Sequence, residues 1–150
     1  MGAVTALSTL GGKVCMDSRG KELWISRKAD GNLKAAWLAD ISALTAVGTD
    51  VNGDLDEFGG ICLPRYDTDV DTAYSSGVLI DIVIPQGGHL YNIYISDPGG
   101  SHGYAGEPMI FHATDPGQLD AGGDIEVEHV ARLFDDILDT TRYATIIWGV

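Results

Sequence analysis

Basic residues are scarce in this sequence. Its 150 residues include nine Lys and Arg against 22 Asp and Glu, which gives a formal net charge of −13. Binding to nucleic acid or to an anionic membrane surface depends on a cluster of positive charge, so we expect neither partner. Long apolar runs are missing too, and none approaches the roughly 18–20 residues that cross a membrane.

Cysteine is also rare, with Cys15 and Cys62 as the only two. Two cysteines form at most one disulfide, and no C-x-x-C pair of the kind that builds redox or zinc sites is present. Both lie in short apolar runs, so we interpret them as small buried thiols. Two free thiols and one bridge are both compatible with this pattern.

Motifs that bind phosphate or metal are weak. None of the glycine pairs is followed by the Lys-Ser/Thr of a phosphate-binding loop. The histidines are scattered and contain no close His-x-His pair: His89, His102, His112 and His129. We therefore predict no enzyme, no metal and no cofactor.

One polar loop has part of a calcium-binding pattern. Asp50, Asn52 and Asp54 occupy the first three ligand positions of an EF-hand loop. Leu55 stands where that loop needs Gly, and Ile61 stands where its bidentate Glu belongs. Asp, Asn and Gly also favour turns for backbone reasons, so these three residues are only a calcium candidate.

Alternating apolar and polar residues mark most of the chain as β structure. About eight short strands are expected, at residues 13–17, 22–26, 61–63, 77–84, 89–96, 107–113, 126–134 and 142–150. We predict that the first two pair as a hairpin. We predict a second hairpin between residues 77–84 and 89–96, across the turn formed by residues 85–88.

One segment has a helical period instead. Its apolar residues fall on one helical face: Leu33, Trp37, Ile41 and Leu44. Asn32 is suited to cap the start of this helix and Gly48 to end it. The pattern predicts one short helix near residues 33–46.

The first 12 residues show neither a strand period nor a helical period. We interpret residues 1–12 as an extended N-terminal arm, which is either disordered or ordered only on a partner. They also lack the positive start and apolar core of a signal peptide. Residues 13–150 are then a single β domain. The predicted fold is mainly β: a small β-barrel or β-tulip of about eight short strands with one short helix.

Three segments of the last third follow one another as strands separated by turns. Residues 106–111 contain a Gly-Glu-Pro step followed by apolar residues. Residues 130–136 combine Ala-Arg-Leu with an acidic pair, and residues 144–150 are mostly apolar. In this order the segments resemble the capsid decoration (cement) proteins of tailed viruses, and the resemblance extends over roughly residues 77–150.

This resemblance implies a non-enzymatic protein that binds the outside of an icosahedral capsid as a trimer. In that family an N-terminal arm spreads over the major capsid protein. The implied capsid-binding residues are therefore Gly2, Ala3, Val4, Thr5, Leu7 and Leu10. The implied partners are the major capsid protein and further copies of this chain, on a virion assembled in the host cytoplasm.

Two alternatives stay open. One is another virion component with a small β domain, such as a tail-tube or head-completion protein. The other is a small β-barrel that binds metal or sugar, or an enzyme, with His102, Glu107 and His112 as its site.

Overall fold

The computed structural model describes residues 22–41, 46–47, 58–95, 103–112, 117–121, 129–137 and 143–150. These residues form ten strands and no helix: β1 (Leu23–Ala29), β2 (Leu38–Asp40), β3 (Ala46–Val47), β4 (Phe58–Cys62), β5 (Leu79–Ile84), β6 (Leu90–Tyr94), β7 (Pro108–Phe111), β8 (Leu119–Ala121), β9 (Ala131–Leu133) and β10 (Tyr143–Trp148). The prediction of a mainly β fold is confirmed.

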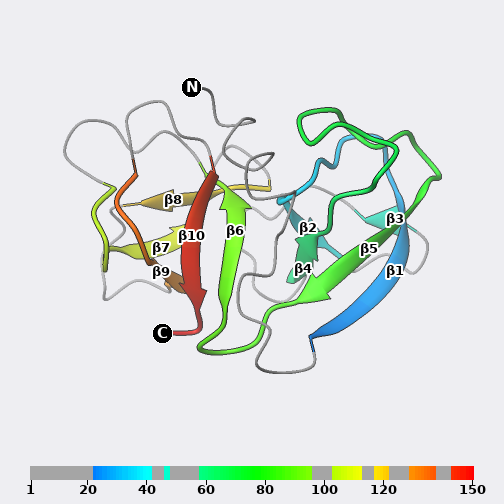
Figure 1. Cartoon of the computed structure of the whole chain (residues 1–150). Helices are drawn as coiled ribbons and strands as arrows, with labels where there is room; N and C mark the ends of the chain where they lie inside the picture. Colours follow the sequence, from blue (N-terminus) through cyan, green and yellow to red (C-terminus); the bar gives the residue numbers. More distant parts are fainter. Residues whose placement is uncertain are drawn as a thin grey trace.

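The strands form two five-stranded sheets that lie side by side (Figure 1). The first sheet has the order β2-β4-β5-β1-β3, and the second has the order β6-β10-β9-β7-β8. Apart from the short parallel pair of β1 with β3, all strand pairs in both sheets are antiparallel.

The second sheet curls until its two edges meet. β6 and β8 are its edge strands, yet Ile95, directly after β6, forms a parallel bridge with Leu119 at the start of β8. Alternate residues of β6 point inward, as the period-2 pattern predicted, and Tyr91, Ile93 and Ile95 are completely buried. The sequence predicted one small β-barrel; this half of the molecule is a half-barrel, and β1 to β5 form a separate sheet.

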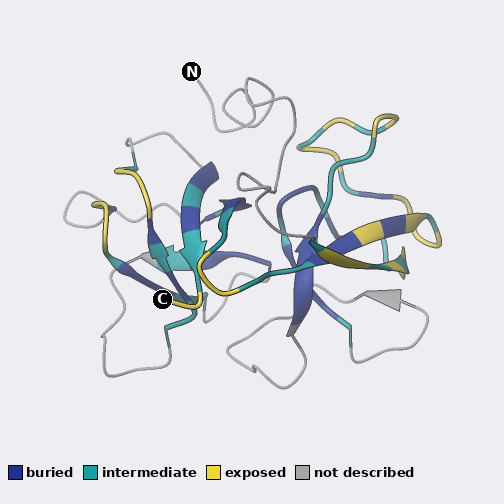
Figure 2. Ribbon diagram, turned by 60° about the horizontal axis from the view of Figure 1, so that its bottom comes forward, coloured by how far each residue is buried: buried dark blue, intermediate teal, exposed yellow. Residues whose placement is uncertain are grey.

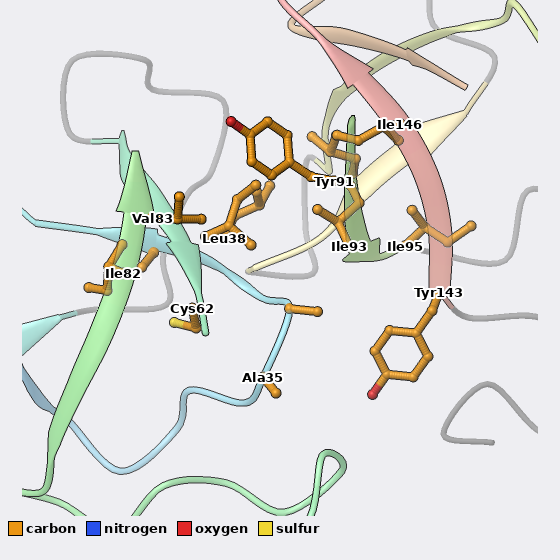
Figure 3. Packing of buried hydrophobic residues seen from close by; sticks show 14 of the residues in the cluster. Ala35, Leu38, Cys62, Ile82, Val83, Tyr91, Ile93, Ile95, Tyr143 and Ile146 are labelled. Atoms are coloured by element: carbon orange, nitrogen blue, oxygen red, sulfur yellow. The ribbon is translucent and has the colours of Figure 1, made fainter. Parts of the chain in front are cut away.

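The first sheet is buried on both faces where β4 and β5 pair. Ile82 and Val83 are neighbours in β5 and therefore point to opposite faces, and both are completely buried. In Figure 3, Leu38 of β2 lies between Val83 of the first sheet and Tyr91 of the second sheet. One continuous cluster of buried residues therefore joins the two sheets.

The predicted hairpin between residues 77–84 and 89–96 is wrong. Both segments are strands, but β5 pairs with β1 and β4, whereas β6 pairs with β10. The turn at residues 85–88 carries the chain from one sheet to the other. Gly88 N donates to Trp148 O (2.7 Å), and Trp148 N donates to His89 O (3.0 Å), so the C-terminal strand takes the place that the sequence pattern assigned to β5.

The predicted helix near residues 33–46 is also wrong for the described part of that range. Residues 38–40 are strand β2 and residues 46–47 are strand β3, while residues 42–45 lie outside the described residues. Ala36 has a φ of 65°, which a right-handed helix does not allow. Apolar spacing of four suggested a one-faced helix, but residues 35–40 are buried except for the partly buried Trp37, and tertiary hydrogen bonds override the helical propensity.

Of the predicted N-terminal hairpin, only the second strand falls within the described residues, and β1 confirms it as the longer Leu23–Ala29. Residues 13–17 and the arm at residues 1–12 lie outside them.

A glycine sits at the contact between the sheets. Gly117, just before β8, has a φ of +76°, and a Cβ at this position would lie 2.3 Å from Cε3 of Trp37. Trp37 stacks on Tyr94 of β6, with ring centroids 5.6 Å apart. Leu38 N donates to Gly117 O (2.9 Å). The backbone of Gly117 therefore lies so close to the ring of Trp37 that only Gly fits at this position.

We predict that Gly117→Ala lowers the free energy of unfolding by about 2–4 kcal/mol, because it adds overpacking to left-handed strain. Gly88→Ala is the matched control. Gly88 also has a positive φ (+80°) but nothing within 4 Å of the added Cβ, so it should cost only about 1 kcal/mol. Urea denaturation measures both. Equal losses of unfolding free energy in the two variants would mean that the clash with Trp37 does not destabilise Gly117→Ala.

Candidate interaction surface

Two loops of the second sheet are bound to each other. Residues 103–106 precede β7 and residues 134–137 follow β9, and in Figure 1 these loops lie together at the left edge of the molecule. Their hydrogen bonds include Gly106 N to Leu133 O (2.8 Å), Ile137 N to Gly103 O (2.6 Å), Ala105 N to Asp136 Oδ1 (2.7 Å) and Arg132 Nη1 to Gly106 O (2.9 Å). Backbone and side-chain bonds thus hold the pair of loops in one conformation.

Each of these loops presents an exposed aromatic side chain. Tyr104 is 57% exposed and Phe134 is 50% exposed. Asp135 and Asp136 follow Phe134 and are exposed as well, and Figure 2 draws exposed loop segments in yellow on this side of the molecule. Exposed aromatic residues on a firmly held backbone are typical of the centre of protein interfaces. We name this region the Tyr104–Phe134 surface.

A second exposed area, with an apolar side chain at each end and polar residues between them, lies on the first sheet. Trp24, Ser26 and Lys28 alternate along β1 and share one face, and Leu79 of β5 is directly opposite Lys28. Trp24 is 64% exposed and Leu79 is 56% exposed. Ser26 Oγ donates to Asp81 Oδ1 (2.6 Å) on the same face. We name this region the Trp24–Leu79 surface.

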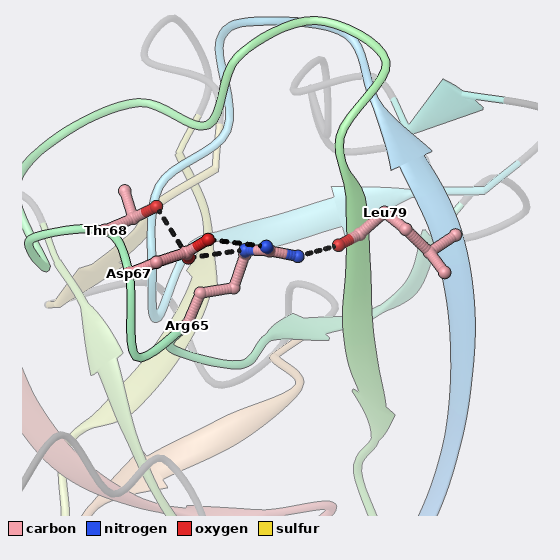
Figure 4. A network of polar contacts seen from close by, with 4 residues as sticks. All are labelled: Arg65, Asp67, Thr68 and Leu79. Carbon is pink, nitrogen blue, oxygen red and sulfur yellow. Dashed lines mark hydrogen bonds and ion pairs between the residues drawn. The ribbon is translucent and has the colours of Figure 1, made fainter.

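The loop between β4 and β5 lines an open cavity. The cavity has a volume of about 450 Å³ and is lined mainly by polar residues: Arg65, Asp67, Thr68, Asp69, Thr72, Ala73, Ser75 and Val78. Its only cationic group is already engaged (Figure 4). Arg65 donates from Nε and Nη2 to the two oxygens of Asp67 (2.9 and 2.8 Å) and from Nη1 to the backbone oxygen of Leu79. The guanidinium therefore braces the loop.

The contact between Arg65 and Asp67 shifts the pKa of both groups. The hydrogen bond from Arg65 lowers the pKa of the Asp67 carboxyl, and the bond to Asp67 raises the pKa of the Arg65 guanidinium. Thr68 Oγ1 also donates to Asp67 Oδ1 (3.2 Å). The ionised carboxylate is thus the form that holds this loop.

A partly buried polar cluster links the start of β1 to the turn between the sheets. Nδ1 of His89 lies 2.6 Å from Glu22 Oε1, and Tyr91 OH donates to Glu22 Oε2 (2.7 Å). Gln86 N donates to Tyr91 OH (2.8 Å). These groups satisfy one another, so His89 fastens two chain segments together.

The structure does not bring the candidate metal residues together. Glu107 and His112 flank β7 at its two ends, about 16 Å apart along an extended backbone, and His102 lies outside the described residues. His129 Nε2 is 3.1 Å from Val150 O. Among the described residues no group of three His, Cys, Asp or Glu is placed to hold a metal ion.

Residues 99–103 read Gly-Gly-Ser-His-Gly, which is the Gly-x-Ser-x-Gly spacing of a hydrolase nucleophile elbow. An elbow requires a strand before the Ser and a helix after it. Only Gly103 of this motif is described, and it begins the loop that leads into strand β7. The required helix does not follow, so this context does not support an elbow.

Several predicted residues lie outside the described part of the chain. They are the arm residues Gly2, Ala3, Val4, Thr5, Leu7 and Leu10, the calcium candidates Asp50, Asn52 and Asp54, and Cys15. Cys62 is described as a free, completely buried thiol, and burial raises its pKa. This agrees with the interpretation of Cys62 as a buried thiol. No helix in the described ranges has the length and apolarity of a membrane span.

Sequence reasoning did not select Trp24, Leu79, Tyr104 and Phe134, which are four of the seven large apolar residues that are exposed in the described part of the chain. A signal existed for Leu79, because the alternation of β5 placed it opposite the buried Ile80 and Ile82. Tyr104 and Phe134 gave no such signal, because their exposure follows from how the two loops bind each other.

No protein-family model matches the sequence, and no curated protein is similar to it. Among solved structures, the chain is similar to the head fiber gp8.5 N base of bacteriophage phi29. The two share 15% sequence identity with a TM-score of 0.49, over 85% of this chain and 94% of that chain. A likeness of this size carries no inference about what this chain does.

We predict that Asp67→Asn loosens the loop formed by residues 65–78. Because folding lowers the pKa of Asp67, the stabilising contribution is complete above its ordinary value of 3.8 and is lost as the pH falls through the lower folded value. Amide hydrogen exchange of Thr68 and Thr72 should therefore show an acid step in the unaltered protein and none in the variant. Protection of the β6 amides serves as the control. An unchanged acid step in the variant would contradict the assignment to Asp67.

Proposed function

We propose that this chain is a structural virion protein without enzymatic activity. In this proposal it decorates the outside of an icosahedral capsid as a trimer and stabilises the junctions between capsomers. Residues 1–12 contact the major capsid protein, and the β domain forms the trimer.

One observation carries the proposal. The three segments that resemble decoration proteins coincide with β7, β9 and β10, and these strands are neighbours in one sheet, since β9 pairs with both β7 and β10. The resembling residues therefore form one continuous body. Its loops carry Tyr104 and Phe134, the two exposed aromatic residues of this half of the molecule.

The edge strands of the half-barrel touch at one point. The bridge between Ile95 and Leu119 joins them there, and a covered edge is less open to strand pairing with other chains. Three copies on one capsid site would add avidity to arms that bind weakly one at a time. The proposal thus gives residues 1–12 the task of binding the capsid and the β domain the task of forming the trimer.

The first expectation concerns assembly. Native mass spectrometry of the purified full chain should detect a trimer, because three-fold sites of a capsid are matched by a three-fold protein. Rings of six would favour a tail-tube or head-completion protein instead. A monomer at every concentration would contradict the trimer.

The second expectation concerns the arm. A chain that lacks residues 1–12 should keep its unfolding midpoint but no longer bind intact particles isolated from the source and stripped of this protein. Electron microscopy of those particles, after the full-length chain is added back, should place it on the outer surface. Full occupancy by the truncated chain would rule out the arm as the binding element.

A further inference from the structure

The cavity on the loop between β4 and β5 is lined by polar groups that the fold leaves unused. The carboxylate of Asp69 and the hydroxyls of Thr72 and Ser75 line it, and all three residues are exposed. Within the described part of the chain, no hydrogen bond engages these side-chain groups. One carboxylate and two hydroxyl groups therefore stand around the cavity ready to bond to a ligand.

The loop that carries these groups is held in one conformation. Tyr74 is buried in the middle of the loop, where its OH donates to Leu63 O (2.7 Å) and its N donates to Leu33 O (2.8 Å). Thr72 N donates to Asp69 O (3.0 Å). A cavity whose wall is ordered before binding spares a ligand the entropic cost of ordering it.

The charges in the cavity favour a ligand without negative charge. Arg65 is the one cationic residue of the lining, and its guanidinium donates to both oxygens of Asp67 and to Leu79 O (Figure 4). Asp69 adds a second carboxylate to the lining. A phosphate or carboxylate ligand would therefore find the guanidinium already engaged and would be repelled by Asp69.

The size and the mixed polarity of the cavity favour a ligand with several hydroxyl groups. Its volume of about 450 Å³ falls in the range of roughly 300–1,000 Å³ that small-molecule sites occupy. A carboxylate only accepts hydrogen bonds, whereas the hydroxyls of Thr72 and Ser75 both donate and accept. Sugar hydroxyls also do both, so they match all three groups. An ammonium ligand only donates, and it would leave the hydroxyl hydrogens of Thr72 and Ser75 unused.

Apolar contacts for a sugar ring are present as well. Ala73 and Val78 line the cavity and are partly buried. Tyr66 lies in the chain between two lining residues, Arg65 and Asp67, and its side chain is completely exposed. A tyrosine ring packs its apolar face against a ligand while its hydroxyl stays in water. These groups suit the C–H face of a pyranose ring, which is apolar.

We propose that this cavity is a binding site for a neutral sugar. The carboxylate of Asp69 accepts hydrogen bonds from the sugar, and the hydroxyls of Thr72 and Ser75 complete the polar contacts. Tyr66 contacts the C–H face of the ring. Asp67 is not a ligand in this proposal, because both of its oxygens are already bonded within the loop. The site goes beyond the proposed function, since it involves neither the trimer nor the N-terminal arm.

Nuclear magnetic resonance of the isotope-labelled full chain tests the site. The chain is titrated separately with D-glucose, D-galactose, D-mannose and N-acetyl-D-glucosamine. At least one sugar should move the amide signals of Asp69, Thr72 and Ser75 until they saturate. Inorganic phosphate and methylammonium are the charged comparisons. Both should bind at these amides more weakly than that sugar, because phosphate is repelled and methylammonium offers donors only.

Substitutions at the cavity should weaken the binding of that sugar. Asp69→Ala removes the charged acceptor and should raise the dissociation constant roughly tenfold or more, because hydrogen bonds to charged groups are among the strong ones. Asp71→Ala is the matched control: Asp71 is exposed on the same loop but does not line the cavity, so the affinity should not change. Thr72→Val, which removes a hydroxyl and keeps the side-chain shape, should also weaken binding. Tyr66→Ala should do the same, whereas Tyr104→Ala should not.

Three results would overturn the site. The first is that none of the four sugars moves these amide signals. The second is that phosphate or methylammonium binds at the same amides more tightly than every sugar. The third is that Asp69→Ala, Thr72→Val and Tyr66→Ala all bind the sugar as the unaltered chain does. Each result would leave the proposed virion role standing, because trimer formation and capsid binding are measured separately.

Discussion

The fold depends on the segment from Ala36 to Leu38, which hydrogen-bonds to both sheets. On one side Ala36 N donates to Cys62 O (2.9 Å) and Cys62 N donates to Trp37 O (2.8 Å). On the other side Tyr94 N donates to Ala36 O, and Leu38 N donates to Gly117 O (both 2.9 Å). Three consecutive residues thus satisfy backbone groups of β4, of β6 and of the entry to β8. Burial makes each of these bonds costly to lose.

Aromatic packing completes this junction and explains its geometry. Trp37 stacks on Tyr94, and Tyr94 meets the edge of Tyr143 at a centroid distance of 5.3 Å. The left-handed backbone of Ala36 is a local cost of about 1–2 kcal/mol, offset by the hydrogen bonds on both sides. Because the junction joins the sheets side by side, the outer face of β1 and the loops of the half-barrel are left at opposite edges of the molecule. The exposed apolar surfaces owe their positions to this arrangement.

The strands with clear alternation could be predicted, and their partners could not. β5 and β6 appear where period-2 patterns placed them, and β7 and β10 lie within the apolar segments that were expected as strands. Alternation reports that one face of a strand is apolar. Alternation does not show which strand lies alongside. The prediction therefore paired β6 with β5, whereas the partner of β6 is β10. The strands β2, β3 and β8 have two or three residues each, which is too short for any period to be recognised. The spacing of Leu33 and Trp37 matched a helix, but Leu33 is completely buried, Trp37 is partly buried, and neither residue lies in a helix.

The sequence by itself determined the fold class, the acidic character and the inward-facing apolar residues of β5 and β6, since these follow from composition and from residues two positions apart. Tertiary structure alone decided the partners of β5 and β6, the extended form of residues 36–38 and the pairing of the loops that carry Tyr104 and Phe134. Those features arise from hydrogen bonds and ring contacts between residues far apart in the chain, and local sequence holds no record of such contacts.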